Sequence, residues 1–362
     1  MKIIKIGEPE VIMSNFGSKH AYFAWPTATR LQNGKIAVVA SGFRRRHVCP
    51  FGKTVISYSE DEGKTYTAPA PVIDTVLDDR DGGILAYGES NVIVTSFNNS
   101  LEFQRKRKEA NEYDFSYLDT VTPEEEAAAI GATFRISHDC GVTFGPILKS
   151  PITSPHGPME LPDGDLLWVG RVFCSHDTER NWEIDRVEAH RIHADGTMEF
   201  VGAIENIVSE GETLASCEPH SILLKDGRLL TQLRVQQRPG GKSRFTTYQC
   251  FSSDLGKSWT KPEPILEPKG GAPSHLFYHS SGMLLATYGY RSEPYGIRVM
   301  FSKDDGMTWD TGNVLYETDI SPDLGYPSTV ELADGSMLTI FYARLEQRGP
   351  AVIIQQKWRF EK

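Results

Sequence analysis

The sequence lacks several features that would assign it to a functional class. Its 362 residues hold 38 Lys and Arg against 48 Asp and Glu, a formal net charge of -10, so it lacks the basic excess of non-specific nucleic-acid binders. No apolar run approaches membrane-spanning length. It has no P-loop, no HExxH, no GxGxxG within a βαβ unit and no EF-hand spacing. We therefore expect a soluble globular protein with no cofactor, no metal, no nucleic-acid partner and no membrane partner.

Cysteine is scarce and shows no pairing pattern. The five cysteines are Cys49, Cys140, Cys174, Cys217 and Cys250. Their odd number, wide spacing and lack of a CxxC motif indicate reduced thiols. The N-terminal stretch MKIIKIGEPEVIM places Glu8 and Glu10 where a secretion signal would have its apolar core. These observations predict a cytoplasmic location.

What the sequence does contain is a repeat, in which two short apolar runs are joined by a turn. The copies are WPTATRLQNGKIAVVAS from Trp25, DGGILAYGESNVIVTSF from Asp81, HGPMELPDGDLLWVGR from His156, EPHSILLKDGRLLTQLR from Glu218, APSHLFYHSSGMLLATY from Ala272 and YPSTVELADGSMLTIFY from Tyr326. Four of the turns are Asn-Gly or Asp-Gly, which favour tight hairpins. The starts are roughly fifty to seventy-five residues apart, which suits a four-stranded blade plus its loops. The repeat predicts an all-β fold, a six-bladed β-propeller of four-stranded antiparallel blades.

A second motif, Ser-x-Asp-x-Gly-x-Thr-aromatic, follows four of these hairpins. Its copies are Ser59–Tyr66, Ser137–Phe144, Ser252–Trp259 with Ser for Thr, and Ser302–Trp309. In such a turn the Asp carboxylate accepts backbone N–H bonds, Gly supplies a positive φ and the aromatic ring packs between strands. The motif resembles the Asp-box, or BNR, repeat of sialidases, and the resemblance covers essentially the whole chain. The segment HADGTMEF, residues 193–200, is similar to a decayed copy in the third blade.

The repeats predict a single domain over residues 1–362. Because the sixth blade ends early, after AVIIQQKWRF, we expect the N-terminal IIKIGEPEVIM to supply its outer strand and so remove a sheet edge. An insertion from about residue 98 to 130 interrupts the second blade. Within it, Thr122 followed by Pro123 predicts the start of a helix.

Hairpin geometry predicts which face carries the chemistry. The turns and Asp-boxes lie at one end of the strands, so the starts of the first strands and the ends of the second strands share the other face. The first-strand starts offer Trp25, Arg80, Asp81, His156, Glu218, His220 and Tyr326. The second-strand ends offer Arg44, Arg45, Arg46, His47, Arg171, Arg234, Arg291 and Arg344. Converging arginines suit a carboxylate or sulfate group, although each could instead pair with a neighbouring acid.

The resemblance to sialidases implies roles for three of these residues. Residues 326–335, YPSTVELADG, are similar to the strand that follows the family's nucleophilic tyrosine, which implies that Tyr326 is the nucleophile. Glu218 and Arg234 match the family's Glu–Arg pair in type and spacing. A neutral phenol beside an anionic sugar avoids like-charge repulsion, and a neighbouring Glu can take its proton.

Two departures from the family pattern concern the substrate and the proton donor. Ala24 stands where the family has its first arginine, and Arg291 matches the third only loosely. The first-blade loop, FRRRHVCPFGKTV, has no carboxylate, so its His47 is a candidate acid or base, with Asp81 of the next blade as the second candidate. We therefore expect an acidic carbohydrate substrate other than an ordinary sialoside, such as a uronic or sulfated sugar, with the first-blade arginines helping to hold it.

Three functions fit this set of residues. The leading hypothesis is a sialidase-like exo-glycosidase that retains configuration through Tyr326 and Glu218. The second is a polysaccharide lyase or atypical glycosidase in which His47 or His156 moves the proton while arginines neutralise a uronate. The third is a sugar-binding propeller without catalysis. The fold alone does not choose among them.

Overall fold

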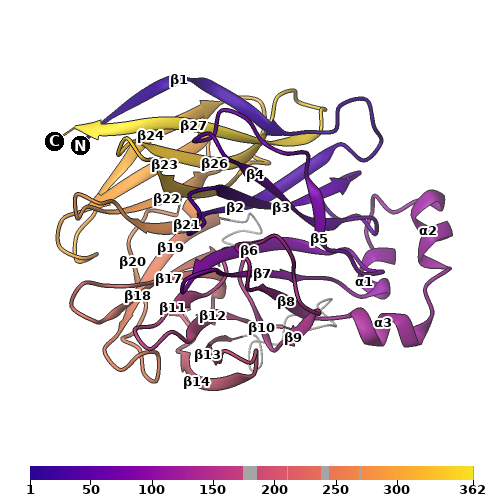
Figure 1. Cartoon of the computed structure of the whole chain (residues 1–362), viewed down its shortest axis with the longest axis horizontal. Helices are drawn as coiled ribbons and strands as arrows, with labels where there is room; N and C mark the ends of the chain where they lie inside the picture. Colours follow the sequence, from indigo (N-terminus) through magenta and orange to yellow (C-terminus); the bar gives the residue numbers. More distant parts are fainter. Residues whose placement is uncertain (174–185, 210, 238–243, 269–270, 362) are drawn as a thin grey trace.

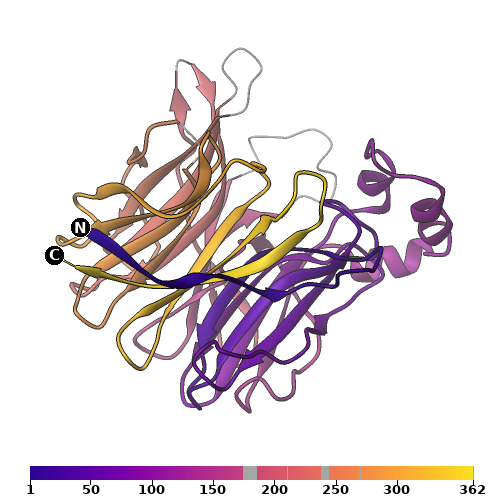
Figure 2. The same cartoon turned by 90° about the horizontal axis from the view of Figure 1, so that it is seen from above.

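The structure, a computed structural model, describes residues 1–173, 186–209, 211–237, 244–268 and 271–361. Six antiparallel sheets surround a central axis as the blades of a propeller (Figures 1 and 2). Five sheets have four strands, and in the third blade the innermost strand is split in two. The predicted six-bladed all-β fold is therefore confirmed. Within the described part of the chain, no helix has both the length and the apolarity needed to cross a membrane.

Each blade runs outward from its first strand at the axis. Blade 1 contains β2 (Tyr22–Arg30), β3 (Ile36–Arg44), β4 (Lys53–Ser59) and β5 (Ala70–Ile73). Blade 2 contains β6 (Arg80–Tyr87), β7 (Asn91–Phe97), β8 (Ala132–Ser137) and β9 (Leu148–Ser150). Blade 3 contains β10 (Ile152–Thr153), β11 (Met159–Glu160), β12 (Leu166–Val172), β13 (Val187–Ile192) and β14 (Met198–Ile204). A small hairpin of β15 (Val208–Ser209) and β16 (Glu212–Thr213) follows it.

The second half of the ring repeats this order. Blade 4 contains β17 (Ala215–Leu223), β18 (Leu229–Gln237), β19 (Arg244–Ser252) and β20 (Glu263–Pro264). Blade 5 contains β21 (Gly271–Tyr278), β22 (Leu284–Tyr290), β23 (Tyr295–Ser302) and β24 (Asp310–Thr318). Blade 6 contains β25 (Gly325–Glu331), β26 (Met337–Arg344), β27 (Ala351–Glu361) and β1 (Lys2–Met13). The ring closes where β1 pairs with β27, from Lys2 opposite Glu361 to Met13 opposite Ile353.

The hydrophobic core consists of six layers, one between each pair of neighbouring blades. Val39 of blade 1 and Val94 of blade 2 lie in one such layer, for example, and both are fully buried. The remaining layers join blades 2 and 3, 3 and 4, 4 and 5, 5 and 6, and 6 and 1. Because every blade is covered on both faces, the middle strands read as nearly continuous apolar runs.

The four Asp-boxes occupy equivalent turns between the third and fourth strands of blades 1, 2, 4 and 5. In blade 1, Asp61 accepts hydrogen bonds from the backbone N–H of Thr65 at 2.8 Å and from its hydroxyl at 2.6 Å. The same pair of bonds recurs in the other three boxes. In blade 3 the degenerate segment 193–200 forms the turn at the same place, where Asp195 accepts bonds from Thr197.

The insertion in blade 2 forms three short helices between β7 and β8. They are α1 (Leu101–Arg105), α2 (Glu112–Leu118) and α3 (Pro123–Ala129), and they project from one side of the propeller (Figures 1 and 2). Thr122 caps α3, accepting a hydrogen bond from the N–H of Glu125 at 3.2 Å, while the Glu125 carboxylate accepts one from the N–H of Thr122 at 2.9 Å. Asp114 of α2 pairs with Arg45 and Arg46 of the first-blade loop, which holds the insertion against blade 1.

Candidate functional site

A bulge at the axial end of the first strand recurs in the blades and defines the site. In blades 1, 2, 4 and 6 the strand register shifts there, and a non-glycine residue adopts a left-handed backbone conformation. The residues are Trp25 (φ 53°), Asp81 (φ 52°), Glu218 (φ 49°) and Tyr326 (φ 51°). Such bulges re-aim side chains, and left-handed non-glycine residues concentrate at functional sites. All four line one cavity of about 330 Å³.

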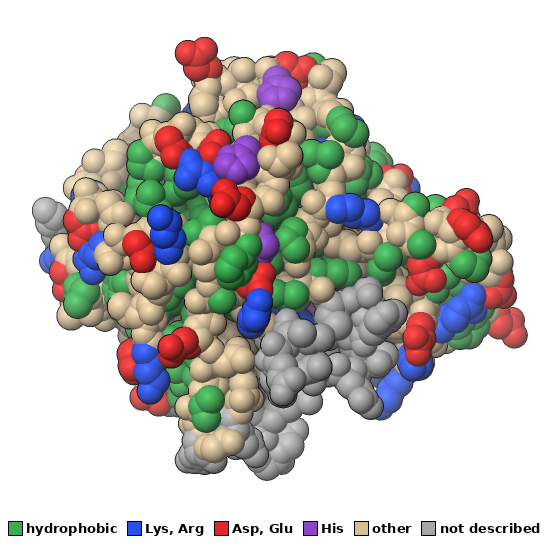
Figure 3. All heavy atoms as spheres, turned by 90° about the horizontal axis from the view of Figure 1, so that it is seen from below, with side chains coloured by type: hydrophobic (Ala, Val, Ile, Leu, Met, Phe, Trp, Pro, Cys, Tyr) green, Lys and Arg blue, Asp and Glu red, His purple; other side chains and the backbone are tan. Residues whose placement is uncertain are grey.

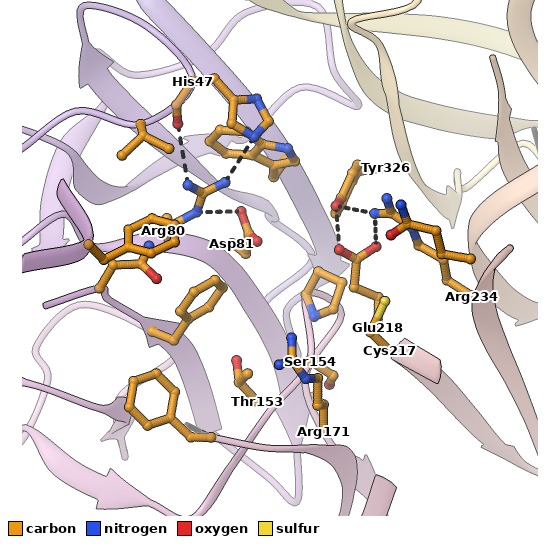
Figure 4. Close-up of a pocket in the computed structure, with 18 of the residues that line it drawn as sticks. His47, Arg80, Asp81, Thr153, Ser154, Arg171, Cys217, Glu218, Arg234 and Tyr326 are labelled. Atoms are coloured by element: carbon orange, nitrogen blue, oxygen red, sulfur yellow. Dashed lines mark hydrogen bonds and ion pairs between the residues drawn. The ribbon is translucent and has the colours of Figure 1, made fainter. Parts of the chain in front are cut away.

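Every blade contributes to this cavity, which we call the axial pocket (Figure 4). Besides the four bulge residues, it is lined by Ser154 and Pro155 of blade 3 and by Arg291, which follows the second strand of blade 5. The pocket thus lies where the starts of the first strands meet the ends of the second strands. This is the face on which the hairpin pattern predicted functional residues.

Tyr326, Glu218 and Arg234 form a closed triangle in the pocket. The Tyr326 hydroxyl donates to Oε1 of Glu218 at 2.7 Å, and Arg234 donates to Oε2 at 2.6 Å and to the Tyr326 oxygen at 3.1 Å. Burial would raise the pKa of Glu218, but the charge and hydrogen bond of Arg234 outweigh it and hold that pKa below its usual value. Burial, reinforced by the Glu218 carboxylate, raises the pKa of Tyr326 well above its ordinary value. The resting pair is therefore a neutral phenol hydrogen-bonded to a carboxylate.

A second titratable group, Asp81, lies across the pocket beside Arg80. Its Oδ1 is 3.5 Å from Nε of Arg80, whose guanidinium stacks on Trp25 at 4.4 Å from the ring centroid. Burial raises the pKa of Asp81 to about 6, and the charge of Glu218 adds to this effect while Arg80 opposes it. Asp81 can therefore keep its proton under mildly acidic conditions while Glu218 has lost its own.

His47 also reaches the pocket and is held neutral. Its ring packs edge-on against Trp25 with centroids 4.8 Å apart, and its Nε2 lies 3.5 Å from a terminal nitrogen of Arg80. Burial, and after it the charges of Arg80 and Arg44, lowers the pKa of His47 well below its ordinary value. A neutral imidazole can accept a proton as a base, but it lacks the imidazolium proton that a general acid would donate.

The sequence matches a known family model. Residues 124–340 match the model described as the BNR repeat-like domain. The chain belongs to this family. The structure is similar to that of a protein of unknown function from Dyadobacter fermentans, with 20% identity, a TM-score of 0.77 and coverage of 99% of both chains. A search of the curated proteins found no match.

Two enzymes share the propeller at lower identity. The intramolecular trans-sialidase of Ruminococcus gnavus is 13% identical, with a TM-score of 0.66 and 97% of each chain covered. The α-L-arabinanase of Penicillium chrysogenum is 13% identical, with a TM-score of 0.64 and 98% of each chain covered. These likenesses extend along the whole chain and, together with the family match, place this BNR repeat-like protein in the sialidase-like superfamily.

In this BNR repeat-like protein, four of the arginines expected at the site do line the pocket, namely Arg80, Arg171, Arg234 and Arg291. Arg291 donates to the Leu324 carbonyl at 3.0 Å and to the Tyr342 hydroxyl at 3.3 Å. Its guanidinium carbon lies 5.8 Å from the centroid of the Tyr326 ring.

The first-blade arginines and Arg344 do not line the pocket, so they do not converge there with the other arginines as expected. Arg44 is fully buried and its NH1 lies 2.6 Å from Asp78, whereas Arg45 and Arg46 pair with Asp114 at 2.9 and 2.5 Å. Arg344 pairs with Asp323 at 2.8 Å. Each guanidinium is already paired with a carboxylate that does not line the pocket.

His156 and His220 also lie elsewhere, further along their first strands, where they line a second cavity of about 470 Å³ at the axis together with His275. The rings of His220 and His275 stack with centroids 4.7 Å apart. Nδ1 of His220 accepts the Leu276 N–H at 2.8 Å, which ties blade 4 to blade 5. These histidines therefore join blades, and among the described residues no cluster of His, Cys, Asp and Glu could hold a metal ion.

Sequence reasoning missed the aromatic wall of the pocket. Phe97, Phe103 and Phe173 line it, as does Arg107 just beyond α1. The missing signal was positional: β7 ends on the functional face, so the insertion that follows it had to begin there. Of the cysteines, Cys217 lines the pocket, and Cys49, Cys140, Cys217 and Cys250 are not in disulfides. Cys174 lies outside the described residues.

Proposed function

We propose that this protein is a retaining exo-glycosidase that removes an acidic sugar. Tyr326 is the nucleophile, Glu218 the base that activates it and Asp81 the acid that protonates the leaving group. The proposal rests on the 2.7 Å hydrogen bond from the Tyr326 hydroxyl to Glu218. Arg234 donates to Oε2 of Glu218 and to the hydroxyl oxygen of Tyr326. A nucleophile bonded to a base that a third group orients is the usual arrangement in covalent catalysis.

The first step forms a bond between the Tyr326 oxygen and the anomeric carbon while the glycosidic C–O bond breaks. The phenolic proton passes to Glu218, and the Asp81 proton passes to the departing oxygen. In the second step Asp81, now a carboxylate, takes a proton from water as the water oxygen attacks the anomeric carbon. The Tyr326 oxygen leaves and recovers its proton from Glu218, which restores the enzyme.

The charge of the pocket selects the acidic sugar. Arg291 lies beside the Tyr326 ring, where a carboxylate or sulfate on the bound sugar can reach its guanidinium. A tyrosine nucleophile suits such a sugar because the neutral phenol does not repel its negative group. The Penicillium chrysogenum arabinanase of the same fold binds arabinobiose, and the Ruminococcus gnavus protein is a trans-sialidase, which supports a carbohydrate substrate.

A lyase is the second candidate, and His47 is the observation that favours it. A neutral imidazole in the pocket could abstract the proton next to a uronate carboxyl group whose charge Arg80 neutralises. A lyase would release an unsaturated product that absorbs ultraviolet light, whereas a hydrolase releases a sugar with a free reducing end.

The test is a matched panel of sialosides, uronides and sulfated glycosides with product analysis. We expect Tyr326→Phe to lower kcat/KM at least about a thousandfold because the nucleophile is lost. Tyr66→Phe is the matched control, because its hydroxyl bonds Gln355 at 2.7 Å outside the pocket. An acidic sugar with fluorine next to the anomeric carbon should leave its mass on the peptide that contains Tyr326. Unchanged turnover by Tyr326→Phe, or an unsaturated product, would overturn the proposal.

A further inference from the structure

Arginines outnumber carboxylates among the described residues of the axial pocket, although the chain as a whole is acidic. Among the described residues that line it, there are five arginines and two carboxylates, those of Asp81 and Glu218. On the outer surface seen in Figure 3, by contrast, basic and acidic side chains are intermingled. A pocket lined by several arginines favours a ligand with negative charge.

Two of the pocket arginines are already compensated by those carboxylates. Arg234 pairs with Glu218 at 2.6 Å, and Arg80 lies 3.5 Å from Asp81 and 4.0 Å from Asp78. For Arg291 and Arg107, no carboxylate of the described residues lies within ion-pair distance. These two cations are the ones open to a charged ligand.

Arg107 is presented on an aromatic support. Its Nε donates to the Phe103 carbonyl at 3.2 Å, and its guanidinium carbon lies 3.9 Å from the centroid of the Phe103 ring. Within the described residues, the two terminal nitrogens of Arg107 have no hydrogen-bond partner. Phe97 and Phe173 line the same side of the pocket, with centroids 6.4 Å apart. Flat rings beside a guanidinium suit the apolar face and the acidic group of a second sugar.

The two open arginines lie on opposite sides of the reacting groups. Arg291 belongs to blade 5 and Arg107 to the insertion of blade 2, and in a ring of six blades these two are diametrically opposed. Asp81, the proposed acid, is also on blade 2 and must face the departing oxygen. The leaving group therefore extends toward blade 2 and Arg107, and the cleaved sugar toward blade 5 and Arg291.

We infer that Arg107 and Phe103 form a subsite for an anionic leaving group. The preferred substrate is then a saccharide with two negative charges, an acidic sugar linked to a second uronate or sulfated residue. This inference rests on the proposed function, because Asp81 sets the direction in which the leaving group points.

The experiment compares two disaccharides that share the acidic sugar and differ only in whether the leaving sugar is neutral or sulfated. At low salt the wild type should have about tenfold higher kcat/KM on the doubly charged substrate. Arg107→Ala should lower kcat/KM on the sulfated substrate about tenfold more than on the neutral one, so that the preference is lost. Arg105→Ala is the control, since Arg105 pairs with Asp119 at 2.6 Å and does not line the pocket.

The outcomes separate this inference from the proposed function. If the wild type cleaves both disaccharides equally, or if Arg107→Ala loses activity on both alike, the subsite is wrong and the glycosidase stands. If neither is cleaved, the glycosidase is wrong, and calorimetric binding of the two disaccharides to wild type and Arg107→Ala decides the subsite. A binding preference for the sulfated compound that depends on Arg107 supports it, and equal binding overturns it.

Discussion

Trp25, Asp81, Glu218 and Tyr326 share a left-handed backbone at the mouth of their blades. For a residue with a Cβ this conformation costs about 1–2 kcal/mol, so the surrounding sheets must over-determine it. The strand bulge re-aims the side chain so that all four residues line the axial pocket. The proposed nucleophile, base and acid thus occupy equivalent positions of three different blades, and their geometry is set before a substrate arrives.

The first prediction concerns Asp81 as the acid. Because the pKa of Asp81 is raised to about 6, its protonated form is present below that pH and disappears above it. The kcat/KM of the wild type should therefore fall as pH rises through about 6. Asp81→Asn should lower kcat/KM roughly a hundredfold or more for sugars with poor leaving groups. For nitrophenyl glycosides, whose departing oxygen needs no proton, it should lower kcat/KM less than tenfold.

Asn tolerates the left-handed backbone, which makes Asp81→Asn a mild change. Asp305→Asn is its control, because Asp305 (φ 53°) has the same backbone conformation in an Asp-box and bonds Tyr278 at 2.6 Å. Equal losses of Asp81→Asn on good and poor leaving groups would assign the proton to another residue, and His47 would be the next to test.

At the scale of elements, helix α2 is held by one buried carboxylate. The side chain of Asp114 is 1% exposed, pairs with Arg45 and Arg46, and accepts a hydrogen bond from the N–H of Asn111 at 3.0 Å in a capping box. Asp114→Ala should lower the free energy of unfolding by about 2–4 kcal/mol, because two arginines lose their partner and the capping box loses the bond from the Asn111 N–H.

Asp119→Ala is the matched control, since Asp119 forms an exposed ion pair with Arg105. It should lower the free energy of unfolding by less than about 1 kcal/mol. Thermal unfolding gives the comparison, and amide hydrogen exchange over residues 112–118 should become faster in Asp114→Ala alone. Equal effects of the two variants would mean that this clamp does not hold the insertion.

In each Asp-box turn the residue just before the glycine has a left-handed backbone conformation, as the glycine itself does. In the fourth blade this residue is Leu255 (φ 56°), whose side chain is 37% exposed. Leu255→Gly should raise the free energy of unfolding by about 0.5–1 kcal/mol, because the removed backbone strain exceeds the added entropy of the unfolded chain. Lys257→Gly, in the same turn but without a positive φ, should lower it by a similar amount. Destabilisation by both changes would contradict this account.

These elements show what the sequence could predict. Hairpins and Asp-boxes depend on contacts within a few residues and recur in phase, so the six blades could be inferred. Whether an arginine faces the pocket depends on a carboxylate distant in sequence: Arg44 meets Asp78 and Arg344 meets Asp323 only in the folded ring. His220 similarly turned out to bond the N–H of Leu276 in a neighbouring blade. The pairing of Glu218 with Tyr326 was expected from their equivalent positions at the starts of first strands and from the resemblance to sialidases.

At the scale of the whole molecule, closure of the ring rests on one strand pair. Lys2 lies opposite Glu361 in the ladder between β1 and β27, so the two ends of the chain are adjacent. A circular permutant can join residue 361 to residue 2 through a short Asn-Gly link and open at the turn between β11 and β12. Its free energy of unfolding should lie within about 1 kcal/mol of that of the wild type.

Deletion of residues 2–13 is the complementary change. It removes β1, leaves β27 as an open edge and exposes part of the layer between blades 6 and 1. We expect this variant to unfold at much lower temperature and to aggregate, as unprotected edges do. Calorimetry and light scattering measure both effects, and a deletion variant as stable as the permutant would show that the closure is dispensable.

That closure also sets an order of events when the protein is made. Within the propeller β1 is synthesised before every other strand, and its partner β27 after all of them. Until then blade 6 lacks its two outer strands, β27 and β1, so no complete blade holds Tyr326 opposite Glu218. During synthesis of the earlier blades the ring stays open, because β1 has no partner strand until β27 is made. We therefore expect the pocket to be complete only after β27 has been made, so a chain interrupted before β27 would have nearly every blade but no assembled site.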